Sequence, residues 1–571
     1  MDANFLPTTR EELQTRGWDA LDIILVTGDA YIDSPYIGAA VIGRVLEHAG
    51  WRVGILAQPE ISSGEDITRL GEPRLFWGIT GGSVDSMVAN YTASKKKRRS
   101  DDYTPGGINN RRPDRAVIAY ANLIRRHFKH TCPLVLGGIE ASLRRVAHYD
   151  FWDDTIRRSI LLDAKGDYLL YGMAEQSVLQ LAYALQEGGD PTRVPGLCYL
   201  AKFPPADYVE LPAYEKITAD QQAFIDMFHL FYQNNEPLTA KGLYQQHANR
   251  FVVQNPPAPY PSQTELDGVY ALPFQRAQHP YSERQGKVKA LETIRFSINS
   301  QRGCYGECNF CSIAVHEGRT VRWRSQTSIL AEAETLTHLP DFKGYILDVG
   351  GPTANMYGFE CSLKLKQGAC QDKRCIYPIV CKALKPDHQK QIDLLRQIRK
   401  VPGVKKVFVG SGIRYDLVLA DAKNGDAYLR EIAAYHVSGQ LKVAPEHSED
   451  SVLQRMGKPR KTDLVAFKRK FDLYSHQAGM QQFLTYYLIA AHPGCTESDM
   501  QRLKRFVSHE LHISPEQVQL FTPLPSTYSA VMYHTGLDPF TRQPLFVEKD
   551  AGKRERQKRI VTEKPKPYKY K

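Results

Sequence analysis

Residues 300–313 read SQRGCYGECNFCSI and place Cys304, Cys308 and Cys311 within eight consecutive positions. A structural zinc site takes four protein ligands, yet the next cysteine, Cys361, is 50 residues beyond the third thiol. Three thiolates on one short loop suit a cubane iron–sulfur cluster that keeps one iron open to an external ligand. The glycines allow the loop to wrap such a cluster, and Phe310 would shield it. We therefore predict that this loop carries chemistry.

The amino-terminal region alternates short apolar runs with helical stretches. Runs at 22–27, 52–58, 75–80, 133–138 and 168–172 are rich in branched or aromatic residues, and residues 35–50 read as a helix. Continuous apolar strands separated by helices predict a doubly wound parallel sheet covered on both faces. Such sheets bind ligands at the carboxyl ends of their strands, where this chain places several glycines. No GxGxxG follows the first run, so the sequence does not indicate a nicotinamide cofactor.

Residues 201–289 break this pattern. The stretch FVVQNPPAPYPSQTELDGVYALPFQRAQHPY (251–281) carries many prolines, which remove hydrogen-bond donors and restrict the preceding residue. We expect an ordered connector between an amino-terminal domain at 1–200 and a second domain at 290–552. A packed extension on the substrate side is the less favoured alternative, because nothing in the stretch indicates chemistry.

The net charge of +11 comes from two segments. Residues 553–571 carry nine Lys or Arg and two Glu, and Lys95–Arg99 (KKKRR) adds +5, so the remainder of the chain is close to neutral at −1. Such runs are usually disordered and solvated, and we expect 553–571 to be a disordered tail. The alternative is an arm that holds nucleic acid or another polyanion without reading its sequence.

Composition excludes several classes of protein. No apolar run approaches the ~20 residues that span a bilayer, and the first residues lack a signal-peptide pattern, so we expect a soluble cytoplasmic protein. Ten cysteines in 571 residues are too few for a disulfide scaffold. Seven of them lie between Cys304 and Cys381, which indicates metal binding in a reducing compartment.

The loop resembles the CxxxCxΦC motif of the radical S-adenosylmethionine (SAM) superfamily, with Phe310 as the aromatic residue. It follows a candidate strand, TIRFSINS (293–300), and precedes a candidate helix, SQTSILAEAETLTHL (325–339). The resemblance continues through 344–352, 406–417, 441–459, 483–500 and 518–533, which look like later strands and loops of the same core. It implies a partial (β/α)6 barrel with its site at the carboxyl ends of the strands.

Within the superfamily the chain is most similar to the YgiQ group, through RSDDYTPGG, LGGIEASLRRVAHYDFW, LDVGGPTANMYG and SGIRYDL. The resemblance implies a [4Fe–4S] cluster on the three cysteines, SAM on the open iron and a 5′-deoxyadenosyl radical that acts on an unknown substrate. It implies a flavodoxin- or ferredoxin-like electron donor as partner. The resemblance also implies that SAM is bound by Gly350, Gly351, Ser411, Arg414 and Glu446. A polar residue after a strand is equally often a helix cap or part of a surface pair. No catalytic residue is indicated.

The amino-terminal region resembles the cobalamin-binding-type domain of some radical enzymes, through DIILVTGDAYIDSPYIGAAVIGRVLEHAGWRVGIL and LVLGGIEAS. The chain lacks the DxHxxG sequence, so no histidine is marked as a lower cobalt ligand. Three alternatives stay open beside an unassigned radical reaction: cobalamin-assisted methyl transfer, modification of tRNA or other RNA, and a zinc-stabilised nucleic-acid-binding protein without catalysis.

A second group of cysteines, Cys361, Cys370, Cys375 and Cys381, follows the GGP stretch. Four soft ligands suit zinc or a fully ligated auxiliary iron–sulfur cluster, and the spacing does not decide between them. Unliganded thiols grouped by chance are the alternative. Cys132, Cys198 and Cys495 are isolated, and we interpret them as packing residues.

Overall fold

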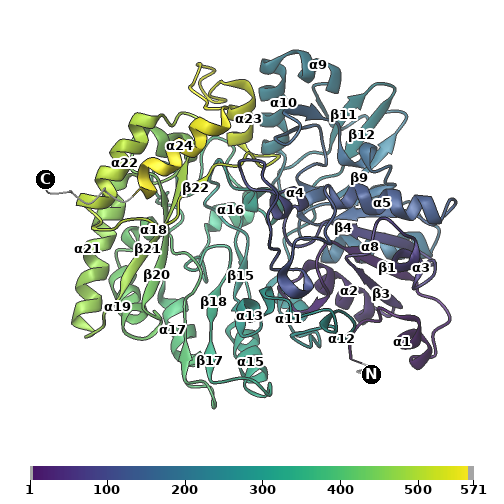
Figure 1. Cartoon of the computed structure of the whole chain (residues 1–571), viewed down its shortest axis with the longest axis horizontal. Helices are drawn as coiled ribbons and strands as arrows, with labels where there is room; N and C mark the ends of the chain where they lie inside the picture. Colours follow the sequence, from purple (N-terminus) through teal and green to yellow (C-terminus); the bar gives the residue numbers. More distant parts are fainter. Residues whose placement is uncertain (1–3, 564–571) are drawn as a thin grey trace, which may run out of the picture.

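The computed structural model describes residues 4–563 and places an amino-terminal sheet beside a partial barrel (Figure 1). The sheet has nine strands in the order β10-β11-β12-β9-β8-β5-β4-β1-β3. Five of them are the strands predicted from the apolar runs, and they are parallel: β1 (Ile23–Thr27), β3 (Val53–Ala57), β4 (Phe76–Thr80), β5 (Leu134–Gly137) and β8 (Tyr168–Leu170).

Helices cover both faces of this sheet, because its strands are apolar on both sides. Ile23 and Leu25 of β1 pack with α2 (Gly38–His48) and α8 (Glu175–Gln186). Ile24 and Val26, which point the other way, pack with α5 (Ala116–His127). The doubly wound sheet is confirmed.

The expected connector at 201–289 is wrong. Its residues extend the sheet through β10 (Val209–Leu211), β11 (Leu243–His247) and β12 (Arg250–Gln254), which joins β9 (Leu197–Ala201), and they form α9 (Tyr214–Ala219), α10 (Gln221–Gln233) and α11 (Gln263–Tyr270). The prolines that suggested irregular structure are concentrated at 256–261, between β12 and α11, where no regular element needs the missing donors.

The second domain is the predicted partial barrel. Within the described residues six strand segments follow one another with parallel pairing: β14 (Ser297–Asn299), β17 and β18 (Tyr345–Ile346, Asp348–Gly350), β19 (Lys406–Val407), β20 (Gln440–Glu446), β21 (Phe483–Ala490) and β22 (Gln519–Leu520). A single parallel bridge, Ile413 to Val443, joins the third segment to the fourth. The helices that pack on these strands include α15 (Gln326–Thr337), α17 (Gln389–Ile398), α19 (Gly425–Tyr435), α21 (Lys461–Gln477) and α22 (Glu497–His509).

Residues 553–562 belong to a packed helix, so the expectation of disorder is wrong for this part; residues 564–571 lie outside the described residues. Helix α24 (Ala551–Thr562) begins at Asp550, whose side chain caps it, and lies against α22, β21 and β22. It buries Arg554, Gln557 and Val561, which share one face at helical spacing. The Ala491 backbone amide donates to Oε1 of Gln557 at 3.0 Å, which ties the helix to the residue that follows β21.

Among residues 4–563, no helix is both long and apolar enough to cross a bilayer.

We expect Val561→Ala to lower the free energy of unfolding by about 1–3 kcal/mol, because it removes buried methyl groups and leaves a cavity between α24 and the barrel. Thermal or urea unfolding measures the loss. Lys553→Ala is the matched control on the same helix, since the Lys553 side chain is exposed and should tolerate truncation. Equal stability of both variants and the wild type would contradict the packing of α24.

Candidate functional site

The cysteine loop leaves β15 (Gln301–Arg302) and ends at α14 (Ile313–His316). Gly303 has φ +84°, and a Cβ there would lie 2.4 Å from the Thr320 oxygen, so only glycine fits this turn. The Gly306 amide donates to the Cys304 sulfur at 3.3 Å. The structure thus requires glycine at 303, and at 306 a Cβ would lie 3.1 Å from the Cys304 sulfur.

The surroundings of the three thiols suit thiolates. Arg414 directs Nη1 at the Cys308 sulfur from 3.6 Å, and Lys458 lies close enough to the Cys311 thiol to lower its pKa. Burial nevertheless raises the pKa of Cys304 and Cys311, because it disfavours the anion. A metal group that binds these two thiols must therefore displace their protons.

These residues fit a cubane cluster with one open iron. Three thiols leave one loop and meet two cations, and the loop itself supplies no fourth cysteine. Within residues 4–563, no three His, Cys, Asp or Glu side chains lie close enough together to hold a single metal ion. That arrangement is compatible with a cluster, in which each thiolate binds a different iron.

Three of the residues predicted to bind SAM lie beside this loop. Gly350 ends β18, Gly351 follows it, and the hydroxyl of Ser411 donates to Asp348 on the same strand. A Cβ on Gly351 would lie 2.8 Å from the Gln301 oxygen, so the segment passes close to the start of the cysteine loop. The structure brings Gly350, Gly351 and Ser411 together.

Arg414 and Glu446 lie elsewhere in the same site. Arg414 forms an ion pair with Asp416 at 2.6 Å and reaches the Cys308 sulfur. Glu446 lies 3.6 Å from the Lys458 amine, and burial raises the pKa of its carboxyl. Neither residue lines the cavity described next, so their role as direct SAM ligands stays a prediction.

A cavity of about 530 Å³ lies between the sheet and the barrel. On the sheet side it is lined at the carboxyl ends of the strands by Thr27, Thr80, Gly82, Gly137, Gly138 and Gly172. On the barrel side it is lined by Arg302, His316, Glu317, Asp348, Gly351 and Ser411. Thr353 comes directly after the lining residues of its segment in the sequence, and its hydroxyl is 3.8 Å from the Cys304 sulfur. The barrel side of the cavity is therefore formed by residues close in sequence to one that contacts the cysteine loop.

Several of the ionisable groups in this wall were not predicted. Glu175 at the start of α8 forms an ion pair with Arg302, which joins the two domains across the cavity. Glu317 accepts the Gly303 amide at 3.0 Å, and burial raises its pKa. Burial lowers the pKa of His316 to about 4, so the imidazole is neutral at pH 7. Glu175 and Arg302 are far apart in the sequence and meet only in the folded chain, so no local motif predicts this pair.

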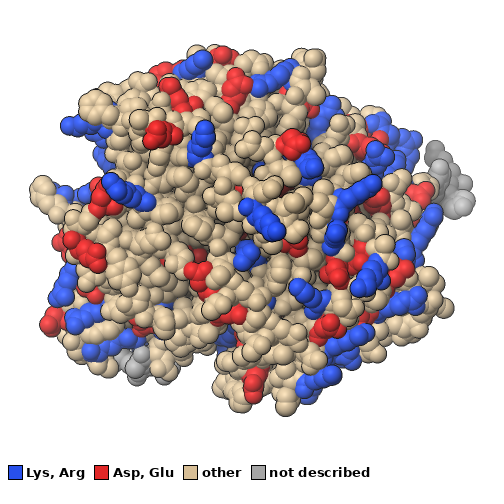
Figure 2. Space-filling model, turned by 180° about the vertical axis from the view of Figure 1, so that it is seen from behind, with Lys and Arg blue, Asp and Glu red and all other residues tan. Residues whose placement is uncertain are grey.

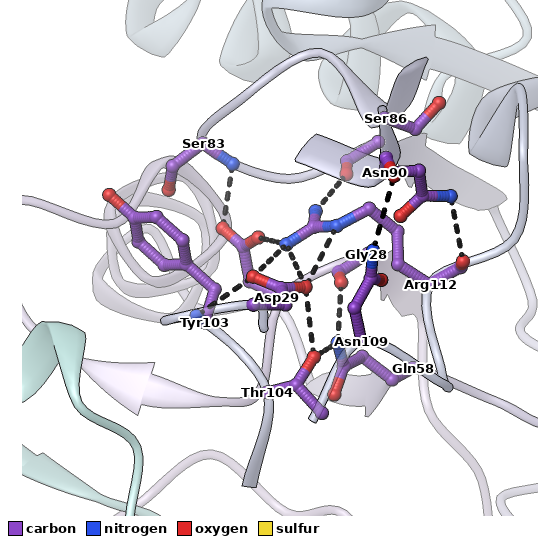
Figure 3. Close-up of polar contacts among 12 residues, drawn as sticks. Gly28, Asp29, Gln58, Ser83, Ser86, Asn90, Tyr103, Thr104, Asn109 and Arg112 are labelled. Carbon is purple, nitrogen blue, oxygen red and sulfur yellow. Dashed lines mark hydrogen bonds and ion pairs between the residues drawn. The ribbon is translucent and has the colours of Figure 1, made fainter. Parts of the chain in front are cut away.

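A buried polar network closes the sheet side of the cavity (Figure 3). The Arg112 guanidinium lies at its centre, 2.8 Å from Asp29 and 3.1 Å from Asp101, and donates to the Gly81 oxygen at 2.6 Å. The Ser83 amide donates to Asp29 at 2.6 Å. The Ser83 hydroxyl is buried and has no hydrogen-bond partner in residues 4–563, so a donor group is left free in the cavity wall.

The second cysteine group is not gathered around one point. Cys361 is buried and Cys370 is exposed. Burial raises the pKa of Cys375 to about 11, although Lys364 donates to its sulfur at 3.7 Å. The Cys381 amide donates to the Cys375 oxygen at 2.8 Å. Within residues 4–563 no three of these thiols lie close enough together to hold one metal ion, so a metal at this group stays a prediction.

The isolated cysteines pack as expected. Cys198 is buried in the sheet core, and Cys132 is partly buried against the same cluster. Cys495 is buried in the barrel, where its sulfur lies 3.6 Å from Nε2 of His447.

Comparisons with known proteins identify the family of the chain. The Radical SAM N-terminal family model matches residues 5–297. A UPF0313 protein of Fusobacterium nucleatum is 55% identical over 563 residues, which cover 98% of this chain and 99% of that protein. A UPF0313 protein of Thermotoga maritima is 49% identical, with 98% and 99% of the two chains covered.

Two solved structures resemble most of the chain at low identity. The radical SAM methyltransferase TsrM of Kitasatospora setae, with cobalamin and a [4Fe–4S] cluster bound, is 15% identical, with a TM-score of 0.49 over 89% of this chain and 77% of that one. The cobalamin-dependent SAM radical enzyme OxsB is 10% identical, with a TM-score of 0.49 over 87% and 53%.

Replacing Cys304, Cys308 or Cys311 by Ala should remove the site-differentiated cluster, because two thiolates cannot hold it. Iron, acid-labile sulfide and the visible absorption of anaerobically purified protein measure the loss. Cys198→Ala is the control, since that thiol is buried away from the loop. A single loop variant that keeps its cluster would refute the assignment.

If the second group binds a metal, the Cys304/Cys308/Cys311 triple alanine variant should still contain zinc or residual iron–sulfur. Elemental analysis of the folded variant decides this. A folded triple variant free of metal would argue against a second site.

Proposed function

Because this chain belongs to the Radical SAM N-terminal family and to the UPF0313 group of relatives, we propose that it is a radical SAM enzyme that cleaves SAM reductively at the Cys304–Cys311 loop. The observation that carries the proposal is the single cavity that runs from the wall beside the thiols to the carboxyl ends of the sheet. A bound SAM and its substrate could meet there. When bound, the cluster and SAM supply a 5′-deoxyadenosyl radical.

The chain's own residues bind and orient SAM in this proposal. The backbone at Gly350 and Gly351 would hold the methionine part, since no side chain stands between it and the cavity. Ser411 would meet the ribose or carboxylate, with Asp348 fixing the direction of its hydroxyl. Arg414 would offset negative charge at the thiolates, because its guanidinium already points at Cys308.

The walls would exclude water and stray hydrogen donors from the radical. The strands contribute apolar side chains such as Leu25, Phe76 and Val135 to the cavity. His316, whose imidazole burial keeps neutral at pH 7, and Glu317, whose pKa burial raises, are the groups of this wall that could move a proton on the substrate. The reaction also needs a flavodoxin- or ferredoxin-like protein that donates one electron.

A second candidate function is cobalamin-assisted methyl transfer. It is favoured by the position of the cavity at the carboxyl ends of a parallel sheet, where glycines allow a flat ligand to approach the backbone. The chain lacks DxHxxG, so the lower face of the cobalt would receive no histidine from that motif.

RNA modification remains an alternative that rests on the basic segments and on the likeness of residues 483–500 and 518–533 to stretches of methylthiotransferase-type members of the superfamily. The zinc-stabilised binding protein without catalysis is not retained, because the family assignment is to radical SAM proteins.

Ser411→Ala should weaken SAM binding about 3- to 10-fold, the cost of one hydrogen bond, while leaving the cluster in place. Equilibrium binding of SAM and anaerobic formation of 5′-deoxyadenosine with dithionite measure it, and Cys308→Ala should form none. Ser475→Ala is the control, since this buried hydroxyl donates to Gln482 away from the cavity. Unchanged binding in Ser411→Ala would remove this residue from the SAM site.

Ile42→Trp should block cobalamin without blocking SAM, because Ile42 lines the cavity on the sheet side and a larger ring would fill it. Hydroxocobalamin retained by the protein after gel filtration, read from its absorbance, measures binding. Wild-type protein that retains no cobalamin would refute the methyl-transfer candidate and leave SAM cleavage standing.

A further inference from the structure

We propose that the surface formed by residues 91–99 and α24 docks an acidic one-electron donor protein, and that a row of buried aromatic rings connects this surface to the cysteine loop. The second part rests on the proposed function, which places a redox group on that loop.

The first basic segment of the sequence meets the described part of the second, α24, in the structure. The loop at 91–99 follows α4 (Ser86–Asn90) and lies beside α24, both on the near side of Figure 1. Ser94 donates to Glu555, and Nη1 of Arg554 donates to the Ala93 oxygen at 3.1 Å. Lys95 and Arg554 lie over the same ring, with Nζ at 4.8 Å and Cζ at 5.3 Å from the centroid of Phe151. These segments carry the charge that makes the chain basic.

The cations of this surface are largely unneutralised. Within residues 4–563, no carboxylate forms an ion pair with Lys95–Arg99, Lys553 or Arg559; Arg556 pairs with Glu497 at 3.2 Å. The side chains at 95–99 are exposed. The face seen in Figure 2 differs, because cations and carboxylates are interspersed there. Gathering like charges costs self-repulsion, which an acidic partner would relieve while it is steered to the surface.

An aromatic row leads inward from this surface. Phe151 lies 5.7 Å from Tyr533, Tyr533 6.1 Å from Phe521, Phe521 4.9 Å from His492, and His492 6.3 Å from Phe310, all between ring centroids. Phe310 stands between Cys308 and Cys311 in the sequence. The four outer rings are buried, so the row crosses the protein interior without a water-filled gap.

This row distinguishes an electron donor from RNA. RNA would bind the same cations, but a row of rings that ends at Phe310, a residue of the cysteine loop, has no role in RNA binding. Electron-transfer partners bind through small, transient interfaces for which charge sets the rate of encounter. One basic loop beside one basic helix offers such an interface.

The transfer is a single electron step. The reduced flavin or iron–sulfur centre of the donor loses one electron, and the group held by the three cysteines gains it. No bond forms or breaks.

The surface is tested by charge reversal. K96E/R99E should weaken binding of purified flavodoxin about tenfold at low ionic strength, and the difference should shrink with salt. K202E/K241E is the matched control, because both lysines are exposed and the net charge changes equally. Titration calorimetry measures this without any loaded cluster. Wild-type affinity in K96E/R99E would overturn the surface, as would loss of bulk tRNA binding with flavodoxin binding unchanged.

The row is tested at Tyr533. Tyr533→Leu should slow reduction of the cluster by reduced flavodoxin severalfold in stopped-flow absorbance, whereas Tyr533→Phe, which keeps the ring, should restore it. Phe224→Leu controls for loss of a buried ring outside the row. Reduction of Tyr533→Leu at the wild-type rate would overturn the row.

Dithionite separates this inference from the proposed function. Reduction of the Tyr533 and Phe224 variants by dithionite, with reduction by flavodoxin slow only in Tyr533→Leu among them, supports the row. A wild-type protein that dithionite cannot reduce would overturn the proposed function and the row with it, while the binding measurement still decides the surface.

Discussion

The shape of the cysteine loop depends on one residue, Asn309, which forms hydrogen bonds through both its backbone and its side chain. Its amide donates to the Met456 oxygen at 2.9 Å, and its oxygen accepts the Ser529 amide at 2.9 Å. Its side-chain amide donates to the Arg455 oxygen at 2.8 Å. A single residue between two thiols is thus bonded to α20 (Asp450–Met456) and to the start of α23 (Tyr528–Thr535). The geometry of the thiols is therefore set by segments about 150 and 220 residues further along the chain, because each unmade bond would leave a buried polar group unsatisfied.

Ion pairs and hydrogen bonds also join the two domains. Arg302 pairs with Glu175 across the cavity, and Arg276 pairs with Glu332 on α15. Helix α10 packs against α23, and Tyr232 on α10 donates to Glu307 inside the cysteine loop at 2.9 Å. The strand ends of the sheet and of the barrel therefore line one shared cavity. In this arrangement a ligand bound on the sheet would face a group bound by the thiols.

The parts predictable from sequence were those with a local cause. Apolar runs of five or so residues marked β1, β3, β4, β5 and β8, and the three closely spaced cysteines marked the loop. The prediction of a connector was wrong because the prolines lie between β12 and α11, whereas the prediction extended their effect to the strands and helices on either side. For α24, basic composition concealed the helical spacing of Arg554, Gln557 and Val561 that buries one face. The cavity wall and the aromatic row join residues hundreds of positions apart, so no local pattern contains them.

The bonds of Asn309 have a consequence for how the protein matures. Synthesis delivers the sheet first, then the cysteines, and only much later Met456 and Ser529, and domains fold in that order as they emerge. The thiols are therefore exposed on an unfinished loop until the last sixth of the chain has been made. A cluster can therefore enter its final environment only after synthesis is complete. Proteins that deliver iron and sulfide would meet an incomplete loop during synthesis, or the folded and buried loop afterwards.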